Sequence, residues 1–139
     1  MMFRQNYKVK GEDVDDFMIM QDFAYHSYTL SIFNTFLFQK GYSKHKVDTL
    51  KMGLQKCKEE LIYQQHLMFT QHFSVHLEFI DSINTKQKLS LRSRFFNSEN
   101  ELCVTVNTEF DYLHNNYQEL LAPSNTLGGH ISMQRSFAP

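Results

Sequence analysis

The stretch DFAYHSYTLSIFNTFLFQK, residues 22–40, has the periodicity of one long helix. The apolar residues that share one helical stripe are Phe23, Leu30, Phe33 and Leu37. Asp22 is a permitted N-cap, and Gly41 stands where a left-handed residue would end the helix. Because apolar residues cover well over half of the circumference, we expect the rest of the chain to wrap around this helix rather than touch one side.

Apolar and polar residues alternate along the second half of the chain, as they do in half-buried strands. Three such segments are residues 73–80, 87–96 and 101–110. The polar breaks DSINTK and NSEN between them are short enough to be hairpin loops. These three strands are therefore expected to be consecutive and antiparallel.

Two further strands are expected before them. Residues 3–9 alternate loosely, and the polar, turn-like residues GEDVDD follow. The segment MGLQKCKEELIYQQ, residues 52–65, has the Lys and Glu content of a helix, but Leu61 and Tyr63 keep strand alternation, which favours a strand. The order is then strand, long helix and four antiparallel strands. This is an α+β architecture in which one antiparallel sheet curls around one long central helix.

Composition limits the classes of function. A chain of 139 residues builds one hydrophobic core, and its formal net charge of -1 comes from interspersed acids and bases, which argues against a nucleic-acid partner. The N-terminus lacks the apolar core of a signal peptide and no later run could cross a bilayer, so we expect a cytoplasmic protein without a membrane partner. Cys57 and Cys103 match no metal-ligand spacing and are expected to be reduced thiols. Thirteen Phe and seven Tyr favour self-association.

With this order of elements, the sequence resembles the hotdog-fold acyl-CoA thioesterases, in the branch of 4-hydroxybenzoyl-CoA thioesterase. Three local matches carry the resemblance: YKVKGEDVDDFMIMQDFAY (residues 7–25), the distance from Asp15 to Gly41, and KEELIYQQHLMFTQHFSVHLEFID (residues 58–81). Their agreement in order and spacing, rather than any strict signature, supports the family.

The resemblance implies hydrolysis of a small or medium acyl-CoA thioester to the free acid and coenzyme A. In the family, an acid in the loop before the helix attacks the thioester carbonyl or activates a water, and on this match that acid is Asp15. Backbone N–H groups near Asp22 and Phe23, at the positive end of the helix, would hold the carbonyl oxygen. Phe17 and Met18 would partly desolvate the carboxylate, and the chemistry needs neither a cofactor nor a metal.

Two features depart from the family pattern. Many relatives have a Gly where this chain has Met18 or its neighbours, and loss of that Gly changes how closely the loop backbone approaches a substrate. The carboxylate of Asp22 would also compete with an oxyanion for the same N–H groups. A second register, in which Asp22 and His26 form an Asp-x-x-x-His pair, makes Asp22 the catalytic acid but leaves the helix short before Gly41. Taken alone, Asp15 would be a turn former.

The remaining candidates concern substrate and metal binding. The candidates for the acyl-binding wall are Phe17, Met18, Phe23 and Tyr25. Those for contacts with the phosphates of coenzyme A are Arg92 and Arg94, with Lys86 and Lys88. Core packing and hairpin solubility explain the same residues without a ligand. His72 and His76 share a strand face like a metal pair, but no third ligand lies nearby in sequence, so we expect no metal.

Family members resemble one another in forming dimers or tetramers with the acyl pocket between subunits. We therefore expect a homodimer or homotetramer in which partner residues near 56–60 complete the site. Residues 1–123 are expected to form the hotdog domain and residues 124–139 a flexible tail. Two other classes stay open: a non-catalytic hotdog protein that binds an acyl ligand or serves as an assembly module, and a purely structural oligomer.

Overall fold

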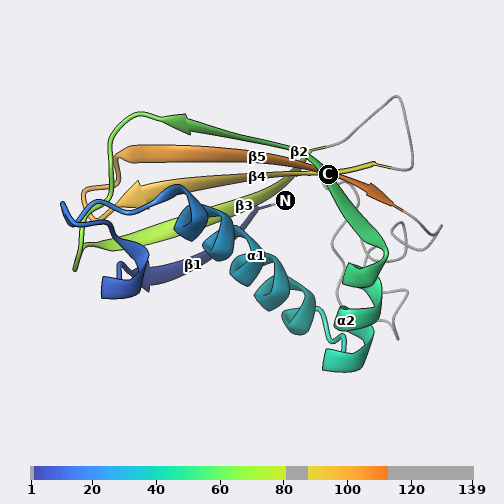
Figure 1. The fold of residues 1–139 in the computed structure, drawn as a ribbon. Helices are drawn as coiled ribbons and strands as arrows, with labels where there is room; N and C mark the ends of the chain where they lie inside the picture. Colours follow the sequence, from blue (N-terminus) through green and yellow to red (C-terminus); the bar gives the residue numbers. More distant parts are fainter. Residues whose placement is uncertain (1, 81–87, 113–139) are drawn as a thin grey trace.

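The computed structural model describes residues 2–80 and 88–112, which form one antiparallel sheet with helices on one side (Figure 1). The strands are β1 (Met2–Lys8), β2 (Leu54–Tyr63), β3 (His72–Ile80), β4 (Lys88–Asn97) and β5 (Leu102–Tyr112). They lie in the order β1-β3-β4-β5-β2, and every neighbouring pair is antiparallel. The expected hairpin partners, β3 with β4 and β4 with β5, are confirmed. The second strand, β2, pairs with the last strand and forms one edge of the sheet.

The long helix α1 (Asp22–Gln39) crosses one face of this sheet (Figure 1). Its end agrees with the prediction, because Lys40 is the C-cap and Gly41 has a φ of 99°, a conformation that Gly adopts without strain. Its start differs by one residue: Gln21 occupies the N-cap position and Asp22 is the first helical residue. Asp22 is therefore not the cap, and its carboxylate is available for another partner.

One face of α1 packs against the sheet. The buried residues recur every three or four positions and are Ala24, Tyr25, Tyr28, Thr29, Ile32, Phe33, Phe36 and Leu37. The architecture of one antiparallel sheet against one long helix is confirmed. However, Phe23 is 53% exposed and Phe38 is 45% exposed, so the expectation that Phe23 belongs to the buried stripe is wrong. A single sheet layer covers only the side of the helix that faces it.

The strands contribute their alternate residues to the core, as the alternation predicts. The inward residues of β3 are Phe73, Val75, Leu77 and Phe79, and those of β4 include Leu89, Leu91 and Phe95. Phe95 lies at the centre of an aromatic group, with its ring centroid 5.1 Å from that of Tyr25 and 5.8 Å from that of Phe73. The core is therefore built from aromatic rings that join α1 to the middle of the sheet.

A second helix, α2 (Lys44–Met52), was not predicted. The hydroxyl of Ser43 caps it by accepting a hydrogen bond from the N–H of Lys46 at 3.1 Å. Only Val47 and Leu50 are buried, so the apolar stripe is too narrow to stand out in a charged sequence. This helix carries the chain from the end of α1 to the edge strand β2 (Figure 1).

The acidic segment between β1 and α1 is an ordered loop that begins with a short 3-10 helix (Gly11–Asp13). It pairs with the loop between β2 and β3, because the N–H of Met20 donates to the carbonyl of Leu67 at 2.9 Å and Ile19 forms a bridge with Met68. These two loops form one end of the molecule. They fix the position of the residues that immediately precede α1.

Part of the sequence prediction concerns residues outside those described. The predicted hairpin loop 81–86, the predicted end of the domain at residue 123 and the predicted tail 124–139 belong to this part, and so does Lys86. Within residues 2–80 and 88–112, no helix is both long and apolar enough to cross a bilayer.

Candidate active site

A cavity of about 460 Å³ lies at the N-terminal end of α1 and contains both predicted acids. Its lining residues come from the acidic loop, the first turn of α1 and the end of β2: Asp15, Ile19, Met20, Gln21, Asp22, Phe23, Tyr63 and His66. The cavity therefore joins carboxylates, a helix N-terminus and aromatic rings in one place.

The carboxylate of Asp15 organises the loop that carries it. Its Oδ1 accepts hydrogen bonds from the N–H of Phe17 at 2.8 Å and from the N–H of Ile19 at 3.1 Å. The N–H of Asp15 in turn donates to the carbonyl of Ile19 at 2.9 Å. Within the described residues, Oδ2 has no hydrogen bond or ion pair. One oxygen thus holds the loop, as in an Asx turn, and the other is open to a ligand.

Met18 stands in the stretch where the resemblance places a Gly, and its backbone has a φ of 67°. This left-handed conformation is costly for a side chain with a Cβ and costs Gly little. The N–H of Met18 also donates to the carbonyl of Asp15 at 2.9 Å, which closes a turn around the carboxylate. The loop therefore keeps a Gly-type backbone although the Gly is absent.

Two backbone donors at the start of α1 are unused. The N–H of Ala24 donates to the carbonyl of Gln21 at 3.0 Å, but the N–H groups of Asp22 and Phe23 have no acceptor within the described residues. The side chain of Gln21 does not cap them, because its Nε2 donates to the carbonyl of Val14 at 3.0 Å. Both N–H groups belong to residues that line the cavity, and their role as oxyanion donors stays a prediction.

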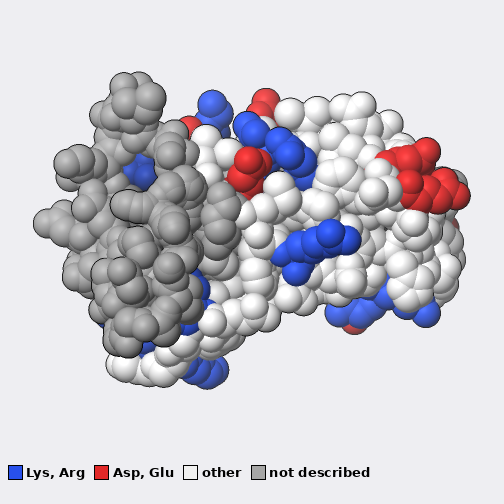
Figure 2. Space-filling model, turned by 180° about the vertical axis from the view of Figure 1, so that it is seen from behind, with Lys and Arg blue, Asp and Glu red and all other residues white. Residues whose placement is uncertain are grey.

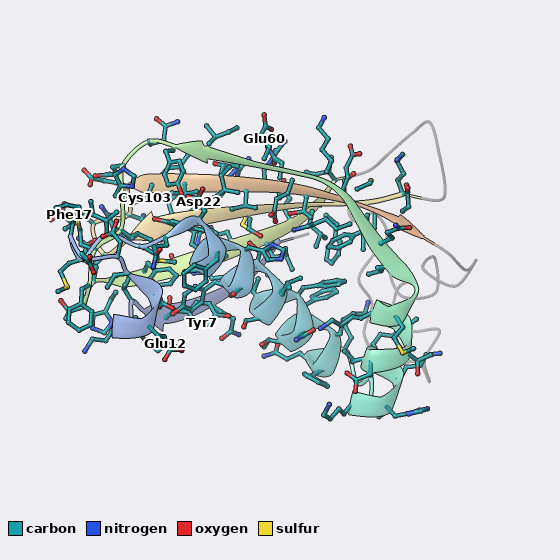
Figure 3. The ribbon with its side chains drawn as sticks, in the orientation of Figure 1. Tyr7, Glu12, Phe17, Asp22, Glu60 and Cys103 are labelled. Carbon is teal, nitrogen blue, oxygen red and sulfur yellow. The ribbon has the colours of Figure 1, made fainter. Side chains whose placement is uncertain are left out.

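The carboxylate of Asp22 is held from the sheet. Its Oδ1 accepts a hydrogen bond from the hydroxyl of Tyr63, at the end of β2. Figure 3 shows Asp22 at the beginning of α1. Burial, and then the hydrogen bond to Asp22 and its negative charge, raise the pKa of Tyr63 above its ordinary value. Tyr63 is therefore a protonated donor at neutral pH.

One helical turn further along α1, His26 has its own partners on β2. Its Nδ1 lies 2.6 Å from Oε2 of Glu59, and its Nε2 lies 3.4 Å from Nζ of Lys56. Burial raises the pKa of Glu59, but the hydrogen bonds to His26 and Lys56 outweigh this effect and bring the pKa below its usual value. His26 is thus paired with Glu59, and no hydrogen bond between His26 and Asp22 exists that would make the second register a proton relay.

The four predicted wall residues lie in different environments. Phe17, at the outer end of the loop in Figure 3, is 78% exposed, and Met18 is half exposed. Phe23 lines the cavity. Tyr25 is fully buried, and its hydroxyl accepts a hydrogen bond from the N–H of Leu67 at 3.2 Å. Burial raises the pKa of Tyr25 to about 12. From the core, Tyr25 therefore supports the loop between β2 and β3, and it does not line the cavity.

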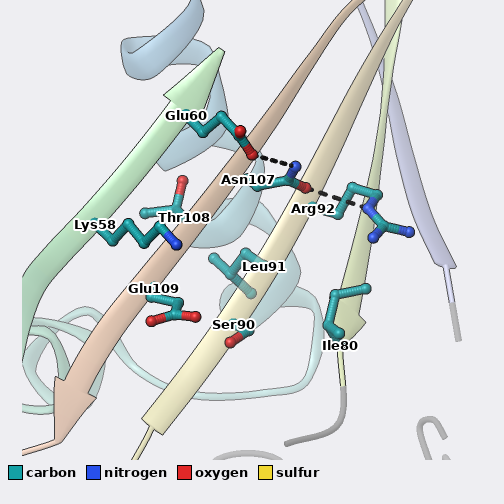
Figure 4. A pocket seen from close by; sticks show the side chains of 9 residues that line it. All are labelled: Lys58, Glu60, Ile80, Ser90, Leu91, Arg92, Asn107, Thr108 and Glu109. Atoms are coloured by element: carbon teal, nitrogen blue, oxygen red, sulfur yellow. Dashed lines mark hydrogen bonds between the residues drawn. The ribbon is translucent and has the colours of Figure 1, made fainter. Parts of the chain in front are cut away.

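Arg92 and Arg94 lie on the face of the sheet that points away from α1. They alternate along β4 with the buried residues, and both approach Oε1 of Glu78, at 3.7 Å and 3.6 Å. Arg92 also donates to Asn107 at the edge of a second hollow of about 220 Å³ (Figure 4). Seen from behind, the molecule carries interspersed basic and acidic side chains (Figure 2). Neither arginine lines the cavity at the start of α1.

The two histidines that share a strand face have no further ligands beside them. Within residues 2–80 and 88–112, no three His, Cys, Asp or Glu side chains are grouped as a metal site. The ring of His76 packs on Phe96, with centroids 4.5 Å apart. Burial, followed by the charges of Arg4 and Arg94, lowers the pKa of His76. Arg4 and Arg94 therefore flank His76 on the two neighbouring strands.

Tyr63 and His66 are site residues that the sequence did not predict. Within the range 56–60, Lys56 and Glu59 contact His26 of their own chain, and the expectation that this range completes the site of a neighbouring subunit stays a prediction. Alternation along β2 assigned side chains to faces, but it contained no signal for which strand lies beside the start of α1. Strand order is a long-range property.

No protein-family model matches the sequence, and a search among curated proteins finds no match. Solved structures share the fold. A Staphylococcus aureus protein in complex with CoA has a TM-score of 0.68 at 19% identity, covering 99% of this chain and 80% of that chain. The DHNA-CoA thioesterase from Staphylococcus aureus has a TM-score of 0.69 at 14% identity, covering 96% and 99%. A variant of 4-hydroxybenzoyl CoA thioesterase complexed with 4-hydroxybenzoyl CoA has a TM-score of 0.67 at 7% identity, covering 80% and 83%.

These likenesses establish that the chain has the hotdog fold. Several of the structures that share it are named acyl-CoA thioesterases, and two contain CoA or a CoA thioester. The expected resemblance to the 4-hydroxybenzoyl-CoA thioesterase branch is confirmed at the level of the fold.

Proposed function

We propose that this protein is an acyl-CoA thioesterase that hydrolyses a small or medium acyl thioester to the free acid and coenzyme A. The observation that carries the proposal is a single cavity, at the N-terminus of the hotdog helix, lined by Asp15 and by the two residues with unused N–H groups, Asp22 and Phe23. A carboxylate and an oxyanion site are sufficient for thioester hydrolysis, since a thiolate is a good leaving group.

In the proposed reaction, the carboxylate of Asp15 takes a proton from a water whose oxygen attacks the thioester carbonyl carbon. The electrons of the carbonyl bond move to its oxygen, which accepts hydrogen bonds from the N–H groups of Asp22 and Phe23. The carbon–sulfur bond then breaks, the carbonyl re-forms and Asp15 returns the proton to the sulfur. Direct attack by Asp15, followed by hydrolysis of the resulting anhydride, gives the same products.

Asp22 stays the lower-ranked candidate for the catalytic acid. Its Oδ1 is occupied by Tyr63, and the His26 that a second register needs is paired with Glu59. Asp15 and Asp22 each have one carboxylate oxygen, Oδ2, without a partner among the described residues, so the ranking rests on the match to the family loop and on the pairing of His26. Phe17, Met18 and Phe23 border this end of the molecule and are proposed to contact the acyl group, over a support formed by Tyr25.

For coenzyme A, we propose that its phosphates contact Arg92 and Arg94. Arg92 and Arg94 share the single carboxylate of Glu78, so the charge of Glu78 neutralises only one of the two positive charges. Because they lie on the face opposite α1, the nucleotide would have to extend around the sheet or come from the site of a second subunit.

We further propose a homodimer or homotetramer in the cytoplasm. Apolar side chains on the uncovered side of α1 and in the adjoining loop support self-association, since Phe17, Phe23 and Phe38 are each more than 40% exposed. The two cysteines Cys57 and Cys103 are free thiols, as in a reducing compartment. Sedimentation equilibrium of wild type beside Phe38→Ser tests the assembly, and a monomeric wild type would contradict it.

A non-catalytic acyl-CoA-binding protein is the second candidate. The observation that favours it is the role of Asp15 Oδ1 as the acceptor of two loop N–H groups, which is a sufficient structural reason for an Asp at this position. Under this alternative, an acyl-CoA would bind and remain intact.

The test is thiol release from short, medium, branched and aromatic acyl-CoAs by wild type, Asp15→Asn, Asp22→Asn and Asp16→Asn. We expect Asp15→Asn to lower kcat by about 100-fold or more. Asp16, the adjacent exposed acid, is the matched control, and its substitution should leave kcat within about twofold.

Three outcomes contradict this proposal in different ways. Loss of activity with Asp22→Asn alone would move the catalytic acid to the second register. A wild type that binds acyl-CoA without releasing thiol would support the binding protein. A wild type that neither binds nor hydrolyses any member of the panel would leave only the structural oligomer.

A further inference from the structure

An acid as the first residue of α1 conflicts with an oxyanion site at the same place. The N–H groups of the first helical turn attract any negative charge nearby. A free carboxylate at Asp22 could therefore turn toward the unused N–H groups of Asp22 and Phe23 and repel an oxygen that develops negative charge. A working site needs a device that keeps this carboxylate elsewhere.

The structure contains such a device on the edge strand. The hydroxyl of Tyr63 donates to Oδ1 of Asp22, across 41 residues of sequence. The ring of Tyr63 is itself held on two sides, since its centroid lies 5.7 Å from that of Tyr25, edge to face, and 5.1 Å from that of His66. A donor fixed in this way directs the carboxylate toward β2 and away from the helix axis.

We infer that Tyr63 is a positioning residue, which holds the Asp22 carboxylate on β2 and leaves the N–H groups of Asp22 and Phe23 open for the thioester oxygen. This inference rests on the proposed thioesterase function and deepens it. It also explains how an acid is tolerated at a position where its carboxylate would otherwise compete with the oxyanion for the helix N–H groups. The hydrogen bond spreads the charge of the carboxylate onto a neutral donor, so that less of it opposes the oxyanion.

The role requires that Tyr63 stays protonated whenever the enzyme works. Burial and the neighbouring Asp22 both disfavour the phenolate, so the pKa of Tyr63 lies above its ordinary value. The hydroxyl is therefore a donor across the pH range in which thioesters are assayed, and its effect should not titrate near neutral pH.

The experiment is a double-mutant cycle on hydrolysis: wild type, Tyr63→Phe, Asp22→Ala and the double variant. Phe keeps the ring contacts and removes only the hydroxyl. With Asp22 present, Tyr63→Phe should lower kcat by about tenfold with KM unchanged, because the oxyanion exists only in the transition state. With Asp22→Ala, the further loss on Tyr63→Phe should be less than about twofold, since no carboxylate remains to be positioned. Tyr7→Phe is the control for removal of a hydroxyl without a hydrogen bond among the described residues.

The outcomes separate this inference from the function on which it rests. An active wild type in which Tyr63→Phe has no effect on kcat, or has the same effect with and without Asp22, overturns the positioning role while the thioesterase function stands. A rise in KM alone would make Tyr63 a substrate contact and also overturns it. A wild type that hydrolyses no thioester overturns the proposed function and this role together. Melting curves of all four proteins identify any variant that is inactive because it is unfolded.

Discussion

Nδ1 of His26 lies 2.6 Å from Oε2 of Glu59, and this pair ties the first half of α1 to the edge strand β2 across 33 residues of sequence. A second tie, from Tyr63 to Asp22, lies four residues away along each element. Because four residues make about one helical turn and return a strand to the same face, the two ties lie side by side. The edge strand thus holds the first turns of the helix that borders the cavity.

The pair of His26 and Glu59 predicts acid sensitivity. The pKa of Glu59 is lowered in the folded protein from 4.5, so the pair stabilises the fold above the unfolded pKa and loses this contribution as pH falls through the folded pKa. Glu59→Gln should lower the free energy of unfolding by about 1 kcal/mol at pH 7. The difference in free energy of unfolding between wild type and Glu59→Gln should shrink below about pH 4. Urea unfolding across pH measures it, with Glu60→Gln, the adjacent residue on the strand, as the control. A deficit independent of pH would contradict the argument.

The positive φ of Met18 predicts an unusual order of stabilities. At 67° the backbone favours Gly, whereas Ala keeps the strain of a Cβ, so Met18→Gly should be more stable than Met18→Ala by about 1 kcal/mol. At Phe17, which does not have a positive φ, the order should reverse because Gly loses more backbone entropy on folding. Thermal unfolding of the four variants measures both differences. Equal stabilities for the two Met18 variants would mean that the loop relaxes without cost.

The buried carboxylate of Asp13 predicts a cost for removing one hydroxyl. The hydroxyl of Tyr28 donates to Oδ2 of Asp13 at 2.6 Å, and Asp13 is only 6% exposed. Tyr28→Phe should therefore destabilise the protein by about 1–3 kcal/mol, because it leaves a buried acceptor short of a partner. Tyr7 is the matched control, since its ring packs on Tyr28 at 4.9 Å but its hydroxyl has no hydrogen bond within the described residues. A similar cost for Tyr7→Phe would locate the effect in ring packing.

The proposed contact of coenzyme A with Arg92 and Arg94 predicts a binding defect. Arg92→Gln and Arg94→Gln should each raise KM for acyl-CoA by about threefold or more without a change in kcat, because the phosphates lie far from the reacting carbonyl. The difference in KM between wild type and each arginine variant should become smaller at high salt, because charge screening weakens the contact in the wild type. Lys44→Gln, an exposed cation on α2, is the control. An unchanged KM for both arginine variants would remove them from the site.

The long helix and the hairpins were predictable because their signals are local. Period 3.6 between Asp22 and Gly41 and period 2 along β3, β4 and β5 reflect which side chains meet a core on one side. The same local reasoning missed α2, since two buried residues, Val47 and Leu50, do not produce a visible stripe among charged neighbours.

The site was partly predictable for a different reason. Asp15, Asp22 and Phe23 are close in sequence, and a loop that enters a helix keeps them close in space, so one stretch of sequence indicated them together. Tyr63 and His66 could not be found in this way. Their place in the cavity depends on β2 pairing with β5 and ending beside α1, which alternation along β2 does not specify.

The sequence by itself determined the long helix, the strands of alternating residues and the acid-bearing loop before the helix, because these follow from the spacing of residues along a short stretch of chain. Only the tertiary structure decided which carboxylate oxygen is open, which helix N–H groups are unused and which strand residue holds Asp22. The hold on Asp22 crosses 41 residues of sequence, and the loop that orients Asp15 is itself paired with Leu67 and Met68, so these contacts form only when the whole sheet assembles.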